Sequence, residues 1–81
     1  MSETIQETFE QRLGRIIRER RKQLGENLKQ FSDRIGPARA TISRIELGSS
    51  DASTTMWVLS EIAKGLGMSA WELARMAETG Q

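Results

Sequence analysis

The stretch from residue 25 to residue 48, GENLKQFSDRIGPARATISRIELG, most constrains how this chain folds. Two short patterns with helical periodicity meet there at an Ile-Gly-Pro turn. At about 100° per residue, the second pattern has one face made of Ala38, Ile42, Ile45 and Glu46. Its opposite face gathers Arg39, Ala40, Ser43 and Arg44. A helix over about 38 to 47 is therefore expected to pack on a core while presenting arginines to solvent.

Two short helices joined by such a turn are the layout of a helix-turn-helix motif, here spanning about 27–47. The major groove of B-DNA admits one α-helix, and an arginine side chain can donate two hydrogen bonds to a guanine edge. The sequence therefore predicts that the second helix reads DNA bases, mainly through Arg39 and Arg44. Ser43 lies on the same face, and Ala40 can only touch a thymine methyl group.

The charge distribution supports this placement although the net charge is only +1. Residues 1–11 carry three acidic side chains and no basic one, and residues 47–81 have a net charge of −2. Residues 12–46 have a net charge of +6. Positive charge is therefore concentrated in the segment that is expected to meet DNA. This feature alone fits equally well an ordinary solvated helix face made of Arg18, Arg20, Arg21 and Lys22.

Composition excludes several classes of function. The 81 residues suffice for one small domain. The chain has no cysteine and no histidine, so neither a disulfide, a zinc site nor an imidazole base is expected. No apolar run approaches the roughly 20 residues that cross a bilayer, and the acidic start MSETIQETFE lacks the features of a secretion signal. We expect a cytoplasmic protein with no enzymatic activity, cofactor or small-molecule ligand.

The remaining sequence predicts three more helices, and so a compact all-α domain of five helices over residues 9–79 after a flexible tail at 1–8. Apolar residues recur at helical spacing from Phe9 to Leu24, before Gly25. Asn27 is expected to cap the next helix. After a polar loop at 48–55, Thr55 is expected to cap a helix whose inward residues are Met56, Leu59, Ile62, Ala63 and Leu66. Ser69 and Glu72 form a capping-box pattern that opens the last helix, so these two helices span 55–78.

Three blocks of the sequence resemble the XRE family, which includes the DNA-binding domains of Cro and lambdoid phage repressors. The blocks are LGRIIRERRKQLG at 13–25, RIGPARATISRIELG at 34–48 and LSEIAKGLGMSAWEL at 59–73. The resemblance implies a lambda-repressor-like fold and base contacts from the positions of Arg39, Ala40, Ser43 and Arg44. Relatives of this size include Cro-like repressors, controller proteins of restriction-modification systems and antitoxins.

Phosphate contacts in such domains come from helix N-termini, short hydroxyl side chains and basic residues. The candidates are Asn27, Lys29, Thr41, Ser49 and Ser50. Ser49 and Ser50 fit equally well as plain loop residues. The family usually has a glutamine where this chain has Leu28, so one backbone contact is either absent or made by another residue.

Glu46 lies on the inward face of the second motif helix, where a carboxylate requires a cationic partner. The resemblance implies Arg21 as that partner. The helical phase of the first helix makes Arg20 the rival partner, and we favour Arg21.

The turn also departs from the family, because Pro37 and Ala38 replace the usual small apolar residue and hydroxyl cap. Proline disfavours helical backbone angles at the residue before it and is well suited to the first position of a helix. We therefore hypothesise that the second motif helix starts one or two residues early, with Gly36 as its cap.

Trp57 and Trp71 fall about 100° away from the apolar stripes of the last two helices, so both are expected to be partly exposed. Exposed aromatic patches often mark interfaces. We interpret Trp57, Trp71 and Met76 as a homodimer interface, although the tryptophans could instead cover loops of their own monomer. A symmetric dimer predicts a palindromic operator on double-stranded DNA. The alternative is a protein-interaction module, such as an antitoxin that binds a toxin partner, with DNA binding secondary.

Overall fold

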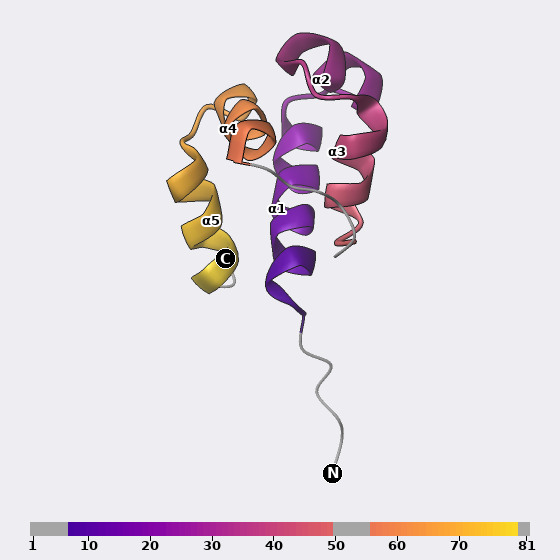
Figure 1. The fold of residues 1–81 in the computed structure, drawn as a ribbon. Coiled ribbons are helices and arrows are strands. Elements are labelled where there is room, and N and C mark those ends of the chain that lie inside the picture. Colours follow the sequence, from indigo (N-terminus) through magenta and orange to yellow (C-terminus); the bar gives the residue numbers. More distant parts are fainter. Residues whose placement is uncertain (1–6, 50–55, 80–81) are drawn as a thin grey trace.

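The computed structural model describes residues 7–49 and 56–79. Five α-helices and no strands form in these ranges (Figure 1). They are α1 (Phe9–Gln23), α2 (Leu28–Ile35), α3 (Arg39–Glu46), α4 (Met56–Gly65) and α5 (Ala70–Thr79). The predicted all-α architecture of five helices is confirmed. None of the helices in the described ranges has the length and apolarity to cross a membrane.

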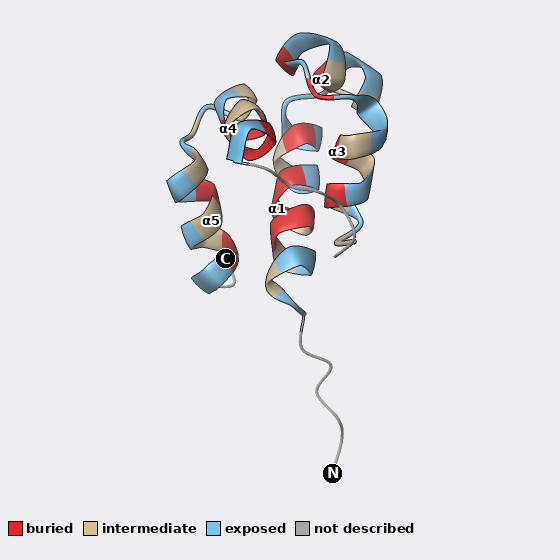
Figure 2. Cartoon of the chain, in the orientation of Figure 1, coloured by how far each residue is buried: buried red, intermediate tan, exposed pale blue. Residues whose placement is uncertain are grey.

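Helix α1 is the central element of the fold. It packs against α3 on one side and α5 on the other, while α2 contacts α3 and α4 (Figure 1). The buried faces of all five helices turn inward toward one another (Figure 2). The largest fully buried side chains are Phe31, Ile17, Ile42, Ile62 and Leu73, which come one from each helix. A single core therefore holds α2 and α3 in place.

Local capping signals set most of the helix ends. Asn27 caps α2, because its side chain accepts a hydrogen bond from the backbone N–H of Gln30 and the Gln30 side chain accepts one from the N–H of Asn27. Ser69 and Glu72 make the same reciprocal pair before α5. Gly25 follows α1 with φ 75°, a left-handed angle that suits glycine.

The start of α1 is also capped, by a residue that we placed in the tail. Thr8 and Gln11 form a capping box, and the Glu7 carboxylate pairs with Arg15 at 3.1 Å. The rest of the expected tail, most of the 48–55 loop and the expected Thr55 cap lie outside the described residues.

The prediction of a buried side chain is wrong for three residues of the expected apolar stripes. Met56 is exposed, and Val58 is buried in its stead, because α4 packs through the 58, 59, 62 and 63 face. Leu24 is half exposed, since it follows the last residue of α1 where the chain turns away. Ala38 is exposed because it precedes α3 and does not share the inward face of that helix.

The hypothesis of an early start for α3 is also wrong, because the helix begins at Arg39. Ala38 has φ −63° and ψ 144°, which is extended backbone. Pro37 is buried, and its carbonyl accepts a hydrogen bond from the Ser32 hydroxyl at 2.6 Å. Its burial and this hydrogen bond hold Pro37 in the turn, so it does not serve as the first residue of the helix.

Candidate nucleic-acid interface

Helix α3 has one buried face and one solvent face. Ile42 and Ile45 are 0% and 3% exposed and fix the helix against the core. Arg39, Ala40 and Arg44 are exposed on the other side, and Ser43 is half-buried beside them. The structure thus brings together the four residues that we expected to face bases.

The guanidinium groups of Arg39 and Arg44 have no ion pair or side-chain hydrogen bond anywhere in residues 7–49 and 56–79. This distinguishes them from Arg15, Arg21 and Arg34, which all bind carboxylates. Each arginine carries five N–H donors in a rigid fork. The solvent face of α3 therefore presents two unneutralised forks that can meet planar acceptors such as a guanine edge.

The ion pair between Arg21 and Glu46 is present and buried. Arg21 Nε donates to Glu46 Oε2 at 2.7 Å and Nη2 donates to Oε1 at 2.9 Å, with the two side chains only 8% and 5% exposed. The hydrogen bond to Glu46 raises the pKa of Arg21 above its ordinary value. Arg21 Nη1 also donates to the Glu26 carbonyl at 2.8 Å. These bonds tie α1 to the last residue of α3.

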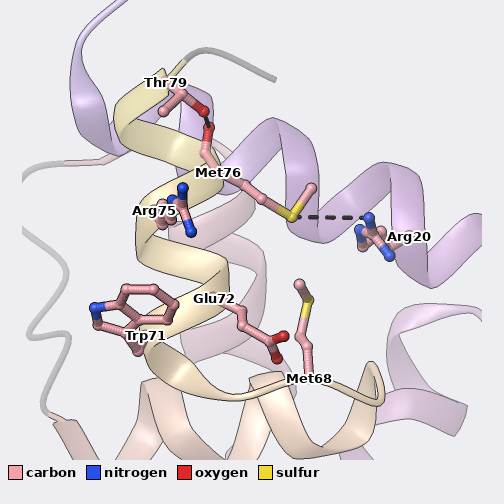
Figure 3. A pocket seen from close by; sticks show the side chains of 7 residues that line it. All are labelled: Arg20, Met68, Trp71, Glu72, Arg75, Met76 and Thr79. Carbon is pink, nitrogen blue, oxygen red and sulfur yellow. Dashed lines mark hydrogen bonds between the residues drawn. The ribbon is translucent and has the colours of Figure 1, made fainter.

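Arg20, the rival partner for Glu46, turns the other way. Its Nη2 atom donates to the Met76 sulfur on α5 at 3.7 Å (Figure 3). The argument for Arg20 from helical phase was therefore wrong, because α1 is sandwiched between α3 and α5 and carries an arginine on each side. The favoured partner, Arg21, is the residue that binds Glu46.

Gly14 is a positioning residue that the sequence reasoning missed. A Cβ atom at this site would lie 2.6 Å from the Glu46 carbonyl oxygen and closer still to that of Ile45. Only glycine therefore lets α1 approach the end of α3 so closely. A glycine inside a helical pattern was the available signal.

The candidate phosphate contacts occupy varied settings. The Asn27 side-chain oxygen is committed to the α2 cap, and Lys29 pairs with Asp33 at 2.9 Å on the surface. Thr41 is half-buried on α3, and the Ser49 N–H donates to the Arg44 carbonyl at 3.1 Å. Ser50 lies outside the described residues. Leu28 packs against the core, and its apolar side chain has no hydrogen-bond donor to offer at the start of α2.

A second ion pair escaped the sequence reasoning. Arg34 on α2 donates from Nε and Nη2 to the Glu26 carboxylate, both at 2.8 Å, and from Nη2 to the Gly65 carbonyl at 2.9 Å. The hydrogen bond from Arg34 lowers the pKa of Glu26 and raises that of Arg34. This arginine therefore joins α2 to the end of α4.

Helices α4 and α5 expose both tryptophans, as expected. Trp57 is 61% exposed and Trp71 is 68% exposed, and the Arg75 guanidinium lies 5.4 Å from the centre of the Trp71 ring. Trp71 borders a hollow of about 440 Å³ that Met76, a half-buried residue, also lines (Figure 3). Trp57 is not among the residues that line this hollow.

The family comparison agrees with this geometry. A helix-turn-helix family model matches residues 17–70, which is more than half of the chain. The chain belongs to the XRE helix-turn-helix family. No match was found among curated proteins or among solved structures. The match of this XRE-family DNA-binding protein covers all of α2, α3 and α4, whereas the start of α1 and the part of α5 beyond Ala70 lie outside it.

Proposed function

We propose that this XRE-family protein regulates transcription, as a repressor or controller, by binding a palindromic operator as a homodimer. The observation that carries the proposal is that the side chains of Arg39 and Arg44 are both exposed and unpaired among the described residues. Both lie on one face of α3, and their guanidinium groups have no ion pair or hydrogen bond among the described residues, while Ile42 and Ile45 anchor the opposite face. Each bidentate contact with a base contributes about 1–3 kcal/mol of discrimination.

The other residues of the interface have supporting roles in this proposal. Ser43 and Ala40 lie between the two arginines on the same face and complete the surface that meets the base edges. Asn27, Lys29, Thr41, Ser49 and Ser50 contact phosphates and set the register of α3 in the groove. The lysine reaches phosphate by exchanging its surface partner Asp33, since an exposed pair of this kind contributes little stability.

The homodimer forms through Trp57, Trp71 and Met76 in the proposal. Two large exposed aromatic side chains on neighbouring helices support an interface there. Helix α5 packs on the side of α1 away from α3 (Figure 1), so pairing through α5 leaves α3 open to DNA. Two such helices separated by about 34 Å span one turn of the duplex.

Selection of bound sequences from random duplex DNA tests the function. We expect a site with twofold symmetry whose half-sites contain G·C pairs at the positions facing Arg39 and Arg44. Arg39→Gln and Arg44→Gln are each expected to reduce the preference for the selected site by about tenfold or more. Lys64→Gln, on the exposed surface of α4, is the control and should leave the preference unchanged.

Two results contradict the proposal in different ways. Recovery of no preferred sequence contradicts base reading by α3. Recovery of a single unrepeated half-site contradicts the homodimer but leaves base reading intact.

The exposure of both tryptophans also favours a second candidate function, in which the protein holds a toxin or other protein partner and binds DNA only secondarily. Salt separates the two candidates. Binding to the DNA groove weakens steeply with salt because counterions are released, whereas a contact centred on tryptophan does not. The arginine variants of α3 should leave a protein partner bound.

A further inference from the structure

Ten basic residues lie between residues 12 and 46, and the structure separates them into two groups. One group makes hydrogen bonds or ion pairs through the side chain and consists of Arg12, Arg15, Arg20, Arg21, Lys29 and Arg34. The other group has no such partner in the described ranges and consists of Arg18, Lys22, Arg39 and Arg44. Two cations that the base-reading proposal does not use therefore remain, both on α1.

Arg18 lies next to the solvent face of α3. A hollow of about 230 Å³ between α1 and the end of α3 is lined by both Arg18 and Ser43, and Leu28 borders it from α2. A second, larger hollow is lined by Arg18 and Lys22 and shares Leu47 with the first. The two hollows thus connect Arg18 and Lys22 on α1 with Ser43 on the solvent face of α3.

The acidic groups of these hollows are largely neutralised by other arginines. Glu46 is held by Arg21, and Glu7 is held by Arg15. Glu19 lies 3.8 Å from Arg15 and is 60% exposed, so its charge is screened by solvent. Arg18 and Lys22 are exposed, and neither is paired with a carboxylate in the described ranges, so both can bind an anionic partner.

We propose that Arg18 and Lys22 form a second phosphate-binding site on α1, which holds the backbone of the same duplex that α3 reads. Residues four apart on a helix have Cβ atoms about 5–6 Å apart, so the two cations can face one strand together. The site has no base-reading role in this proposal, because its two cations belong to α1 and only border the helix that reads bases. This inference rests on the proposed function and adds a backbone anchor to it.

The test measures how the affinity for duplex DNA depends on salt for the wild type, Arg18→Gln, Lys22→Gln and the double variant. Two probes are used, a duplex recovered by selection and a random-sequence duplex. Each lost phosphate contact should reduce the slope of log affinity against log salt by about 1 and the double variant should reduce it by about 2. The affinity for the two duplexes should fall by the same factor, so the preference of the protein between them is unchanged.

Lys64→Gln serves again as the matched loss of one exposed positive charge, and its slope should equal that of the wild type. Circular dichroism verifies that each variant is folded, which is expected because Arg18 and Lys22 are exposed. The charge-reversed Arg18→Glu variant should lower the affinity for both duplexes further than Arg18→Gln does.

Three outcomes overturn the inference. If the double variant keeps the wild-type slope while the wild type still selects its site, the α1 anchor is wrong and the function of α3 stands. If the variants change the preference between duplexes, Arg18 reads bases and does not hold phosphate. If the wild type binds neither duplex in a salt-dependent manner, the proposed function and the α1 anchor fail together.

Discussion

Arg21 on α1 and Glu46 at the end of α3 form a bidentate ion pair that connects the central helix to the helix that we propose reads DNA bases. The two N···O distances are 2.7 and 2.9 Å, and both side chains are almost completely buried. Glu46 is the last residue of α3, so the pair controls the end of that helix directly. The Arg21 guanidinium donates hydrogen bonds to the Glu46 carboxylate and to the Glu26 carbonyl, which identifies Arg21 as a structural residue.

Removal of one partner from this pair should be severely destabilising. Glu46→Ala leaves a buried guanidinium without its counter-charge, and we expect the free energy of unfolding to fall by about 3–5 kcal/mol. Urea denaturation followed by circular dichroism measures this change. The double variant Arg21→Met, Glu46→Leu should recover most of the loss because no charge is then left buried. A loss below about 1 kcal/mol in Glu46→Ala would falsify the burial argument.

Gly14→Ala should force α1 and α3 apart. The new methyl group would meet the carbonyl oxygens of Ile45 and Glu46, and backbone oxygens cannot rotate away as a side chain can. We expect a loss of at least about 2 kcal/mol in the free energy of unfolding. Gly67→Ala is the control, since Gly67 has φ 79° with open space around it and should cost only about 1 kcal/mol of backbone strain. Equal losses in the two variants would show that the close approach at Gly14 is unimportant.

The Arg34–Glu26 pair predicts a pH dependence of stability. Because the hydrogen bond from Arg34 lowers the pKa of Glu26 in the folded state, the unfolded state binds the proton more tightly. The contribution of the pair is therefore complete above the ordinary pKa of glutamate and disappears as the pH falls through the folded pKa of Glu26. The pair is partly exposed, so the contribution is small.

This pH effect appears in the difference in unfolding free energy between the wild type and Glu26→Gln. The difference should be present at neutral pH and close in acid. Glu78→Gln, at an exposed carboxylate with no ion pair in the described ranges, should show no such closing gap. A wild-type advantage over Glu26→Gln that persists unchanged in strong acid would contradict the assignment to this ion pair.

Local signals were enough to predict much of the fold from sequence. The caps by Asn27 and Ser69 depend on side chains only three residues away, and helical period alone places Arg39 and Arg44 opposite Ile42 and Ile45. Such features need no knowledge of the rest of the chain, because the partners are held together by one turn of helix.

Features that depend on packing between distant segments were not predictable in this way. The start of α3 is set by the burial of Pro37 and its bond with Ser32, which override the preference of proline for the first helical position. The partner of Glu46 followed from the family resemblance and not from helical phase, because α1 is buried on two sides. The contact of Arg34 with the Gly65 carbonyl joins residues 31 positions apart and has no local signature.

Trp71→Ser should weaken the proposed homodimer. Tryptophan is enriched among residues that dominate interfaces, and truncation of such a residue costs about 2 kcal/mol or more, or roughly 30-fold in the dimer Kd. Sedimentation equilibrium over a range of concentrations measures the change. Leu47→Ser removes another exposed apolar side chain, 78% exposed and directly after α3, which packs on the side of α1 away from α5, and should leave the dimer unchanged. A wild-type protein that stays monomeric at high micromolar concentration rules out this interface.

Ala38→Ser should stabilise the domain at the start of α3. Ala38 occupies the N-cap of α3 with extended backbone angles but provides no side-chain hydrogen bond to the first turn. A serine there can accept from an unsatisfied N–H, which contributes about 0.5–2 kcal/mol, so we expect a rise in Tm of about 4–8 °C for a gain of 1 kcal/mol. Ala40→Ser makes the same change two residues later, where no cap is possible, and should give no gain. Asn27→Ala should lose a similar amount at the occupied cap of α2, because the carbonyl of its side chain is the acceptor there. If Ala38→Ser and Ala40→Ser shift the Tm equally, the empty cap of α3 is not a source of instability.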